Sequence, residues 1–310
     1  MAHIPDGFLS APVLATTTVA SAGALALAVH RSRRQLRDRQ APLLGAATAF
    51  VFAAQMFNFP LGAGTSAHLL GGVLVAAVVG PWVGMLVLFS VILVQALLFQ
   101  DGGITAIGAN TLNMAVVGAG VGYLMYRWLF LLLGDGARRR VLSAALAAYV
   151  SAALVGAAVA VELASSGTVP LRPALLAVGG SHLLVGVGEA VLTGGILSVL
   201  VRLRPDLFQA PAVTARGRAW AFGGLGVALA VAVGAAYGAS SLPDALESGS
   251  ATLGLAARAG TWAPLARLGG AGRPWAAAIG VLAAFTLAWV LFRLNTGRRR
   301  RDEKGARTDA

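Results

Sequence analysis

Cysteine is absent from the 310 residues of this sequence, so disulfide bonds, thiolate metal sites and cysteine nucleophiles are excluded. Charge is also scarce, because Asp, Glu, Lys and Arg make up 12% of the residues, whereas soluble domains average about 25%. So few charges cannot cover a water-facing surface. Since 57% of the residues are hydrophobic and the mean hydropathy is +0.78, we expect lipid to cover most of the protein.

Several enzyme and targeting motifs are missing as well. The nucleotide-binding pattern GxxxxGK followed by Ser or Thr does not occur, so the chain is not expected to hydrolyse ATP itself. The zinc-protease pattern HExxH is also absent. The segment 1–7 carries no Lys or Arg, so we expect no cleavable signal peptide, whose removal would take away His3.

The net charge of +12 raises the question of nucleic-acid binding. The arginines, however, gather in short clusters between apolar runs, at 31–39, 138–140, 202–218 and 298–301. This distribution is typical of membrane topology and differs from the continuous basic surface of a nucleic-acid-binding protein. We therefore expect membrane lipid, and no nucleic acid, as the partner of these charges.

The apolar runs predict an all-α integral membrane protein built as a polytopic helical bundle. A helix needs about 20 apolar residues to cross the hydrocarbon core of a bilayer. By this measure we expect about seven transmembrane helices, plus two in the C-terminal region. The candidate runs are 11–29, 42–59, 66–80, 81–100, 108–133, 141–163, 172–201, 219–238 and 275–293.

The arginine clusters also predict an orientation. They follow the first, fifth, seventh and ninth runs, so all four fall on one side of the membrane. Because arginine-rich loops stay on the cytoplasmic side, the N-terminus is expected outside and the C-terminal tail in the cytoplasm. The segment 239–274 is then an external loop of a multi-pass protein of the cell membrane.

Polar side chains inside the apolar runs are costly in lipid and usually mark function. His68 lies between small residues, which fits either a ligand site or a histidine that packs helices together. His182 and Glu189 are seven residues apart on one helix face, which favours a structural polar pair over a proton relay or a support for a metal-binding histidine. The amides of Gln95, Asn110 and Asn113 could either bond neighbouring helices together or line a pocket. Glu162 is the remaining ionisable residue within the apolar runs.

His3 lies close enough to the N-terminus for the terminal amine to join it as a metal ligand. The amine, a deprotonated backbone amide and the imidazole form fused chelate rings, and such nitrogen ligation favours Ni(II) or Cu(II) over Zn(II). If Met1 is kept, two amides complete a square plane without further help. If Met1 is removed, as the small Ala2 permits, three nitrogens remain and His68 is the expected fourth ligand. We favour the second state; a loose terminal histidine is the alternative.

Several stretches resemble the CbiM/NikM substrate-capture subunits of energy-coupling-factor transporters for cobalt and nickel. Together they cover about residues 1–205. The matching stretches are MAHIPDGFLS at 1–10, SAHLLGG at 66–72, GPW at 80–82, QALLFQDGGI at 95–104, GANTLNMA at 108–115 and HLLVGVGE at 182–189.

The resemblance implies a function and a ligand set. In that family the N-terminal segment folds back into the membrane domain, where the terminal amine, the amide and imidazole of the second residue and a histidine equivalent to His68 hold the ion. Here Ala2 separates Met1 from His3, and removal of Met1 restores the family arrangement. The resemblance also implies import of Co(II) or Ni(II), with cobalt feeding cobalamin biosynthesis, and as partners a transmembrane coupling subunit and two ATPase subunits.

The C-terminal part carries a second resemblance. The stretch SSLPDALE at 240–247 is similar to the motif of the small CbiN/NikN-type accessory subunit, with Ala245 in place of a glycine. The expected division is a capture domain at 1–205, an accessory region at 206–297 and a basic tail at 298–310. Two other classes of function remain open from the residues alone, a stand-alone channel or carrier and an intramembrane enzyme that uses His182 and Glu189.

Overall fold

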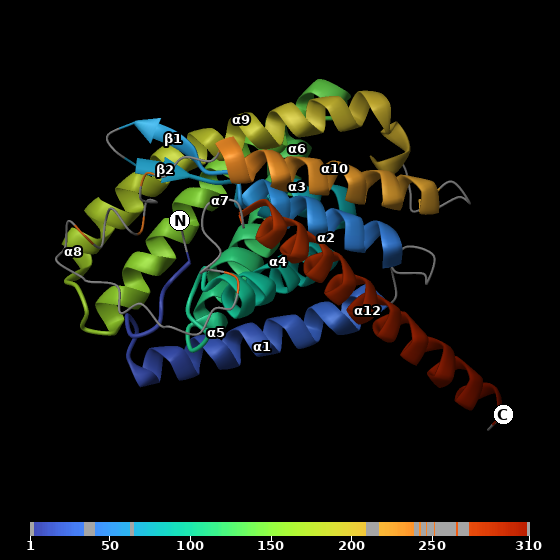
Figure 1. Cartoon of the computed structure of the whole chain (residues 1–310), viewed down its shortest axis with the longest axis horizontal. Coiled ribbons are helices and arrows are strands. Elements are labelled where there is room, and N and C mark those ends of the chain that lie inside the picture. Colours follow the sequence, from blue (N-terminus) through green and yellow to red (C-terminus); the bar gives the residue numbers. More distant parts are fainter. Residues whose placement is uncertain are drawn as a thin grey trace.

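The structure is a bundle of helices that cross one another at various angles (Figure 1). The N-terminal segment and the hairpin of β1 (Phe59–Gly62) and β2 (Thr65–Ala67) lie against the bundle, while the C-terminal end of α12 (Arg273–Thr308) extends beyond it (Figure 1). The computed structural model describes residues 3–33, 41–62, 65–208, 217–238 and 273–308, together with Leu242, Leu246, Ala251 and Leu265.

Seven helices of the described ranges are long and apolar enough to cross a membrane, which confirms the predicted all-α membrane fold. Each spans at least 18 residues, close to the roughly 20 that a bilayer requires. Four of them are single elements: α1 (Ala11–Arg33), α7 (Ala137–Ser165), α10 (Gly217–Gly238) and α12 (Arg273–Thr308).

The other three spans contain segments of π-helix. The elements are α4 (Pro81–Val94) with η2 (Gln95–Phe99); α5 (Ile107–Asn110), η3 (Thr111–Val121) and α6 (Gly122–Leu133); and α8 (Leu171–Ala174), η4 (Leu175–Gly179) and α9 (Gly180–Leu203). A short 3₁₀ turn, η5 (Pro205–Phe208), follows. Because π-helical turns shift side chains around the helix axis and often occur at functional sites, the start of η2 at Gln95 draws attention to that residue.

Two of the nine predicted runs do not form spanning helices. The run 42–59 gives only α2 (Ala41–Gln55), and the run 66–80 becomes helical only from Gly72 onward. It contains the hairpin strand β2 (Thr65–Ala67), paired antiparallel with β1 (Phe59–Gly62), then an irregular segment at 68–71, and then the eight-residue α3 (Gly72–Val79). Gly71, with φ of 72°, stops a helix from starting earlier. Apolar composition alone cannot distinguish a buried irregular segment from a helix.

Small residues allow the helices to pack closely. A Cβ on Gly156 of α7 would lie 2.4 Å from the Cβ of His182 on α9, and one on Gly186 would lie 2.9 Å from the Tyr149 carbonyl. Membrane helices commonly use such glycines because they let two backbones approach. The same applies to α2, which packs against both α10 and α12 (Figure 1), with Phe52 close to Gly280.

The C-terminal helices belong to the same bundle as the rest. Asn295 of α12 donates to the Ser32 hydroxyl at 3.0 Å and accepts from Arg33 Nε at 2.8 Å, which ties α12 to the end of α1. Leu242 and Leu246 are the described residues of the 240–247 motif. The remainder of that motif, the linker residues 209–216 and most of the predicted external loop lie outside the described residues.

Candidate metal-binding site

The N-terminal segment enters the core of the bundle, where His3 is 4% exposed and Ile4 is fully buried. The side-chain amide of Asn110 holds its backbone on both sides. The Ile4 amide donates to Asn110 Oδ1 at 2.7 Å, and Asn110 Nδ2 donates to the Ile4 carbonyl at 3.1 Å. This pair of hydrogen bonds resembles the pairing between two β-strands. It fixes the backbone of Ile4 and thereby the position of the preceding residue, His3.

A second group of bonds holds the segment further along. The Asp6 carboxylate accepts from the amides of Ile104 and Thr105, at 3.2 and 2.8 Å, and from the Thr105 hydroxyl. Gly103 fits under Asp6 only because it lacks a side chain, since a Cβ there would lie 2.4 Å from Asp6 Oδ1. Thr168 donates to the Phe8 carbonyl at 2.6 Å. The described part of the N-terminal segment is therefore fastened to the 103–105 turn and to Thr168.

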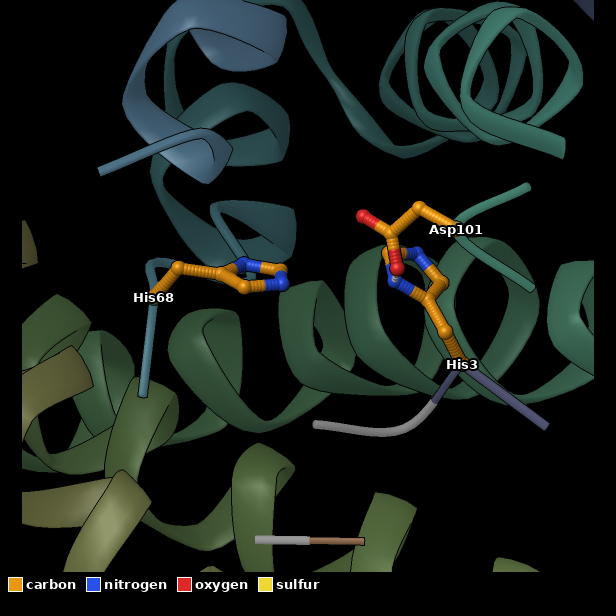
Figure 2. Close-up of side chains that lie close together, drawn as sticks. All are labelled: His3, His68 and Asp101. Carbon is orange, nitrogen blue, oxygen red and sulfur yellow. Dashed lines mark ion pairs between the residues drawn. The ribbon is translucent and has the colours of Figure 1, made fainter. Parts of the chain in front are cut away.

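His3, His68 and Asp101 converge in the core, as Figure 2 shows. Their potential ligand atoms all lie within 4.8 Å of one another. The two imidazole ring centroids are 5.6 Å apart, and His3 Nδ1 lies 2.7 Å from Asp101 Oδ1. The three residues come from the N-terminal segment, the irregular segment after β2 and the turn after η2, so distant parts of the sequence build one site.

The charge state of the site follows from its contacts. Burial alone would raise the pKa of Asp101, but the interactions with His3, including their hydrogen bond, and with His68 outweigh it and hold that pKa at about 2. The pKa of His68 is lowered well below its usual range, chiefly because burial disfavours the charged ring. At neutral pH the site therefore combines an ionised carboxylate with a neutral His68 imidazole, the form that binds metals.

The tautomer of His68 also follows from its neighbours. Its Nδ1 lies 3.1 Å from the Leu69 carbonyl oxygen, which can only accept a hydrogen bond. The proton is therefore assigned to Nδ1, and Nε2 keeps its lone pair. Histidines that ligate metals commonly donate their other ring N–H to a carbonyl in this way. The ring points toward His3 (Figure 2), so the unprotonated Nε2 is directed into the candidate metal site.

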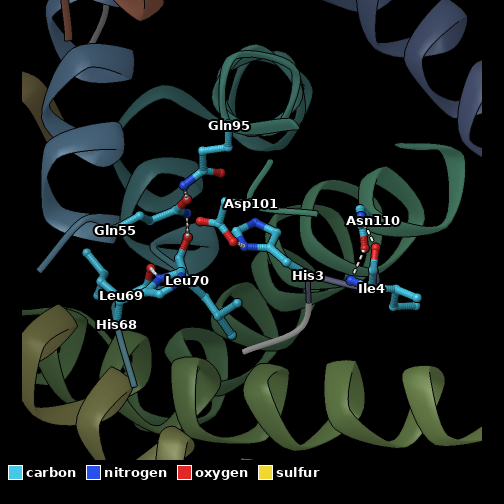
Figure 3. A network of polar contacts seen from close by, with 9 residues as sticks. All are labelled: His3, Ile4, Gln55, His68, Leu69, Leu70, Gln95, Asp101 and Asn110. Carbon is cyan, nitrogen blue, oxygen red and sulfur yellow. Dashed lines mark hydrogen bonds and ion pairs between the residues drawn. The ribbon is translucent and has the colours of Figure 1, made fainter. Parts of the chain in front are cut away.

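Side chains from three helices fix the irregular segment that carries His68, and Figure 3 shows two of them, Gln55 and Gln95. Gln55 Nε2 donates to the Leu70 carbonyl at 2.8 Å, and Gln95 Nε2 donates to Gln55 Oε1 at 2.9 Å. From α9, the Glu189 carboxylate accepts from the amides of Leu70 and Gly71. Non-helical backbone at membrane depth is tolerated where protein groups satisfy its polar atoms, as these side chains do here.

The remaining residues singled out from the sequence are placed elsewhere. Asn113 Nδ2 donates to Glu162 Oε2 at 2.7 Å, which joins η3 to α7. His182 Nδ1 lies 2.8 Å from the Val178 carbonyl of its own helix, whereas Glu189 takes its partners from the His68 segment. Met1 and Ala2 lie outside the described residues.

Asp101 was not identified as a candidate from the sequence. It stands in the stretch QDGGI at 100–104, directly after an apolar run, and its side chain is 40% exposed. The sequence does contain a signal, an acidic residue followed by Gly102, whose φ of 92° marks a tight turn. Nothing in the sequence, however, places this turn beside residue 3.

Comparison with known proteins identifies relatives. Residues 3–207 match the family described as cobalt uptake substrate-specific transmembrane region. The chain is 36% identical to the fused nickel transport protein NikMN of Rhodobacter capsulatus, over 86% of this chain and 83% of that protein. It is 38% identical to a putative metal transport protein of Haloquadratum walsbyi, over 66% and 92%. A crystal structure of a transition metal transporter matches with a TM-score of 0.59 and 34% identity, over 67% and 96%.

Proposed function

This chain belongs to the family of cobalt uptake substrate-specific transmembrane regions, and on that premise we propose that it captures a Co(II) or Ni(II) ion for import. The observation that carries the proposal is the convergence of His3, His68 and Asp101, where the described part of the chain begins with the buried His3. Imidazole nitrogens suit nickel and cobalt, whereas calcium and magnesium prefer all-oxygen sites.

The proposed ligands are the terminal amine of Ala2, the backbone amide and Nδ1 of His3, and Nε2 of His68. Only Nδ1 of His3 lies close enough to its own backbone amide to close a chelate ring. That nitrogen contacts Asp101 at 2.7 Å in the structure, so the incoming ion takes the place of this contact. Four nitrogen donors in one plane favour Ni(II), and cobalt follows it closely in affinity.

Asp101 has a separate role in this proposal. A divalent ion bound to one deprotonated amide keeps one net positive charge, which is costly to bury without a partner. The Asp101 carboxylate, whose pKa of about 2 keeps it ionised, supplies the compensating negative charge beside His3. The occupied site is then neutral overall.

We further propose that the chain works with a transmembrane coupling subunit and two ATPase subunits, and that its N-terminus faces outside. The arginine clusters follow the first, third, fifth and seventh of the seven long helices, so all four still fall on one side. The division into a capture domain and a fused accessory region rests on the match of residues 3–207 and on the fused NikMN relative. If the imported ion is Co(II), we propose that it feeds cobalamin biosynthesis.

Metal binding is expected to be stoichiometric and to weaken as the pH falls. The ordinary pKa of a terminal amine is about 7.7–8.0, and the amide also loses a proton on binding, so protons compete with the ion. The lowered pKa of His68 means that this ring stays neutral in the same range. Equilibrium dialysis of the purified protein with Ni(II) or Co(II) should give one ion per chain at pH 8. At pH 6 the affinity should be at least about 100-fold lower; an equal affinity at both values would contradict the ligand set.

Transport is expected to require the ATPase partners. In vesicles that contain this chain alone, uptake of ⁶³Ni(II) should stay at the level of empty vesicles, although the purified chain binds the ion. Addition of coupling and ATPase subunits with ATP should start uptake. The rival function, a stand-alone carrier or channel, predicts uptake without partners. An intramembrane enzyme is not favoured, since Glu189 bonds backbone amides of the His68 segment.

A further inference from the structure

A cavity of about 240 Å³ lies beside the candidate metal site and shares part of its lining. His68 and Asp101 belong to both. The remaining lining comes from α2, the segment after it, and the helix end at 95–99: Phe52, Gln55, Met56, Asn58, Gln95 and Phe99. His3 is not among the lining residues, so the cavity is an adjoining chamber and not the nitrogen site itself.

Two amide oxygens of the lining have no hydrogen-bond partner among the described residues. They are Gln95 Oε1 and Asn58 Oδ1, and both atoms are buried. The Gln95 side chain is 2% exposed, and its Nε2 is committed to Gln55. The orientation of the amide is thereby fixed (Figure 3), and the oxygen is the atom left over. Buried polar atoms without partners are rare and call for an explanation, such as an ion or water that they accept from.

The chemistry of the chamber differs from that of the nitrogen site. Apart from the His68 ring, which the two share, its free polar atoms are two neutral amide oxygens and the Asp101 carboxylate, all of which accept hydrogen bonds. A hydrated divalent cation directs the protons of its water shell outward, so such acceptors hold it without replacing its waters. At about 30 Å³ per water, the chamber has room for about eight waters, enough for an ion with six.

We propose that this chamber is an entry station for the hydrated Co(II) or Ni(II) ion, which resides there before it exchanges water for the nitrogens of His68 and His3. The inference rests on the proposed function and adds a second binding position to it. The ion keeps its waters in the chamber and gains direct nitrogen ligands, which suit Co(II) and Ni(II), only at the next position, so the station holds it only in transit. Asp101, present in both linings, attracts the ion to the boundary between the two positions.

Substitutions at Asn58 test the station because this residue contacts the chamber but supplies none of the proposed nitrogen ligands. Asn58→Leu fills space and removes the acceptor oxygen, whereas the matched variant Asn58→Asp keeps an acceptor and adds a negative charge. Binding of Ni(II) is followed by stopped-flow change in protein fluorescence, and the equilibrium affinity by dialysis. Thermal unfolding of each variant shows whether it is folded.

The station predicts that Asn58→Leu slows association about tenfold while the equilibrium affinity stays within about threefold, and that Asn58→Asp associates faster than the unmodified protein. A change in rate without a change in affinity is expected because the station lies on the path both in and out. Unchanged association rates in both variants would overturn the inference. If Asn58→Leu does not fold, Asn58→Asp decides alone, and an unchanged rate there overturns it. If the unmodified protein does not bind Ni(II) at all, the proposed function itself is refuted.

Discussion

His68→Ala should reduce the affinity for Ni(II) and Co(II) by more than about 100-fold, since even a residue that only orients a metal ligand contributes about 10–100-fold. His68 offers a neutral ring whose Nδ1 is engaged with the Leu69 carbonyl, so its Nε2 is ready to bind. Removal of the ring leaves three nitrogens from the N-terminus and an incomplete coordination plane. Isothermal titration of the purified variant measures the loss.

His30→Ala is the matched control, because His30 lies exposed in the last turn of α1 and should bind the ion as the unmodified protein does. We expect His68→Ala to fold, because Glu189 and Gln55 hold the neighbouring backbone of Leu70 without help from the imidazole. Its folding is checked separately. If a folded His68→Ala protein keeps its affinity, His68 is not a ligand.

A permanent extension upstream of Ala2 should lower the affinity by a comparable factor, more than about 100-fold. The extension converts the terminal amine into an amide, which removes a ligand. It also adds chain at a point where the following residues, His3 and Ile4, are buried and fastened by Asn110. Affinity is measured by equilibrium dialysis, and mass spectrometry of the intact protein identifies its first residue.

The control for this prediction is the same fusion with a protease site placed so that cleavage leaves Ala2 as the first residue. Cleavage should restore binding in full. Equal affinity before and after cleavage would show that the amine is not used. If the unmodified protein instead retains Met1, the amine, two amides and His3 complete a plane by themselves, and His68→Ala should then bind normally. The two predictions therefore test each other.

Hydropathy predicted the seven long helices because a spanning segment must be apolar over most of its length, whatever packs around it. Hydropathy did not predict the irregular start of the run 66–80, because a buried irregular segment is as apolar as a helix. This segment is stable here because Gln55 and Glu189 form hydrogen bonds with the backbone of Leu70 and Gly71. Those partners are distant in sequence, so no local pattern signals the irregular segment.

The candidate site divides in the same way. His3 was identified because a histidine near a free amine is a chelator by covalent geometry alone, and His68 because an imidazole in an apolar run is costly. Asp101 was missed because a carboxylate in a turn between spans is unremarkable until His3 is placed 2.7 Å from it. Asn110 and Gln95 were noted as polar residues, but their partners, Ile4 and Gln55, were not predicted.

The sequence by itself determined that this is a polytopic helical membrane protein, that cysteine plays no part in it, and that the pattern GxxxxGK followed by Ser or Thr does not occur. These properties depend on composition and on neighbours along the chain. Only the tertiary structure decided that Asp101 joins the two histidines and that a chamber with unpartnered amide oxygens adjoins them. The physical reason is that a buried polar group must be matched by partners in space, and the packing of the helices selects those partners.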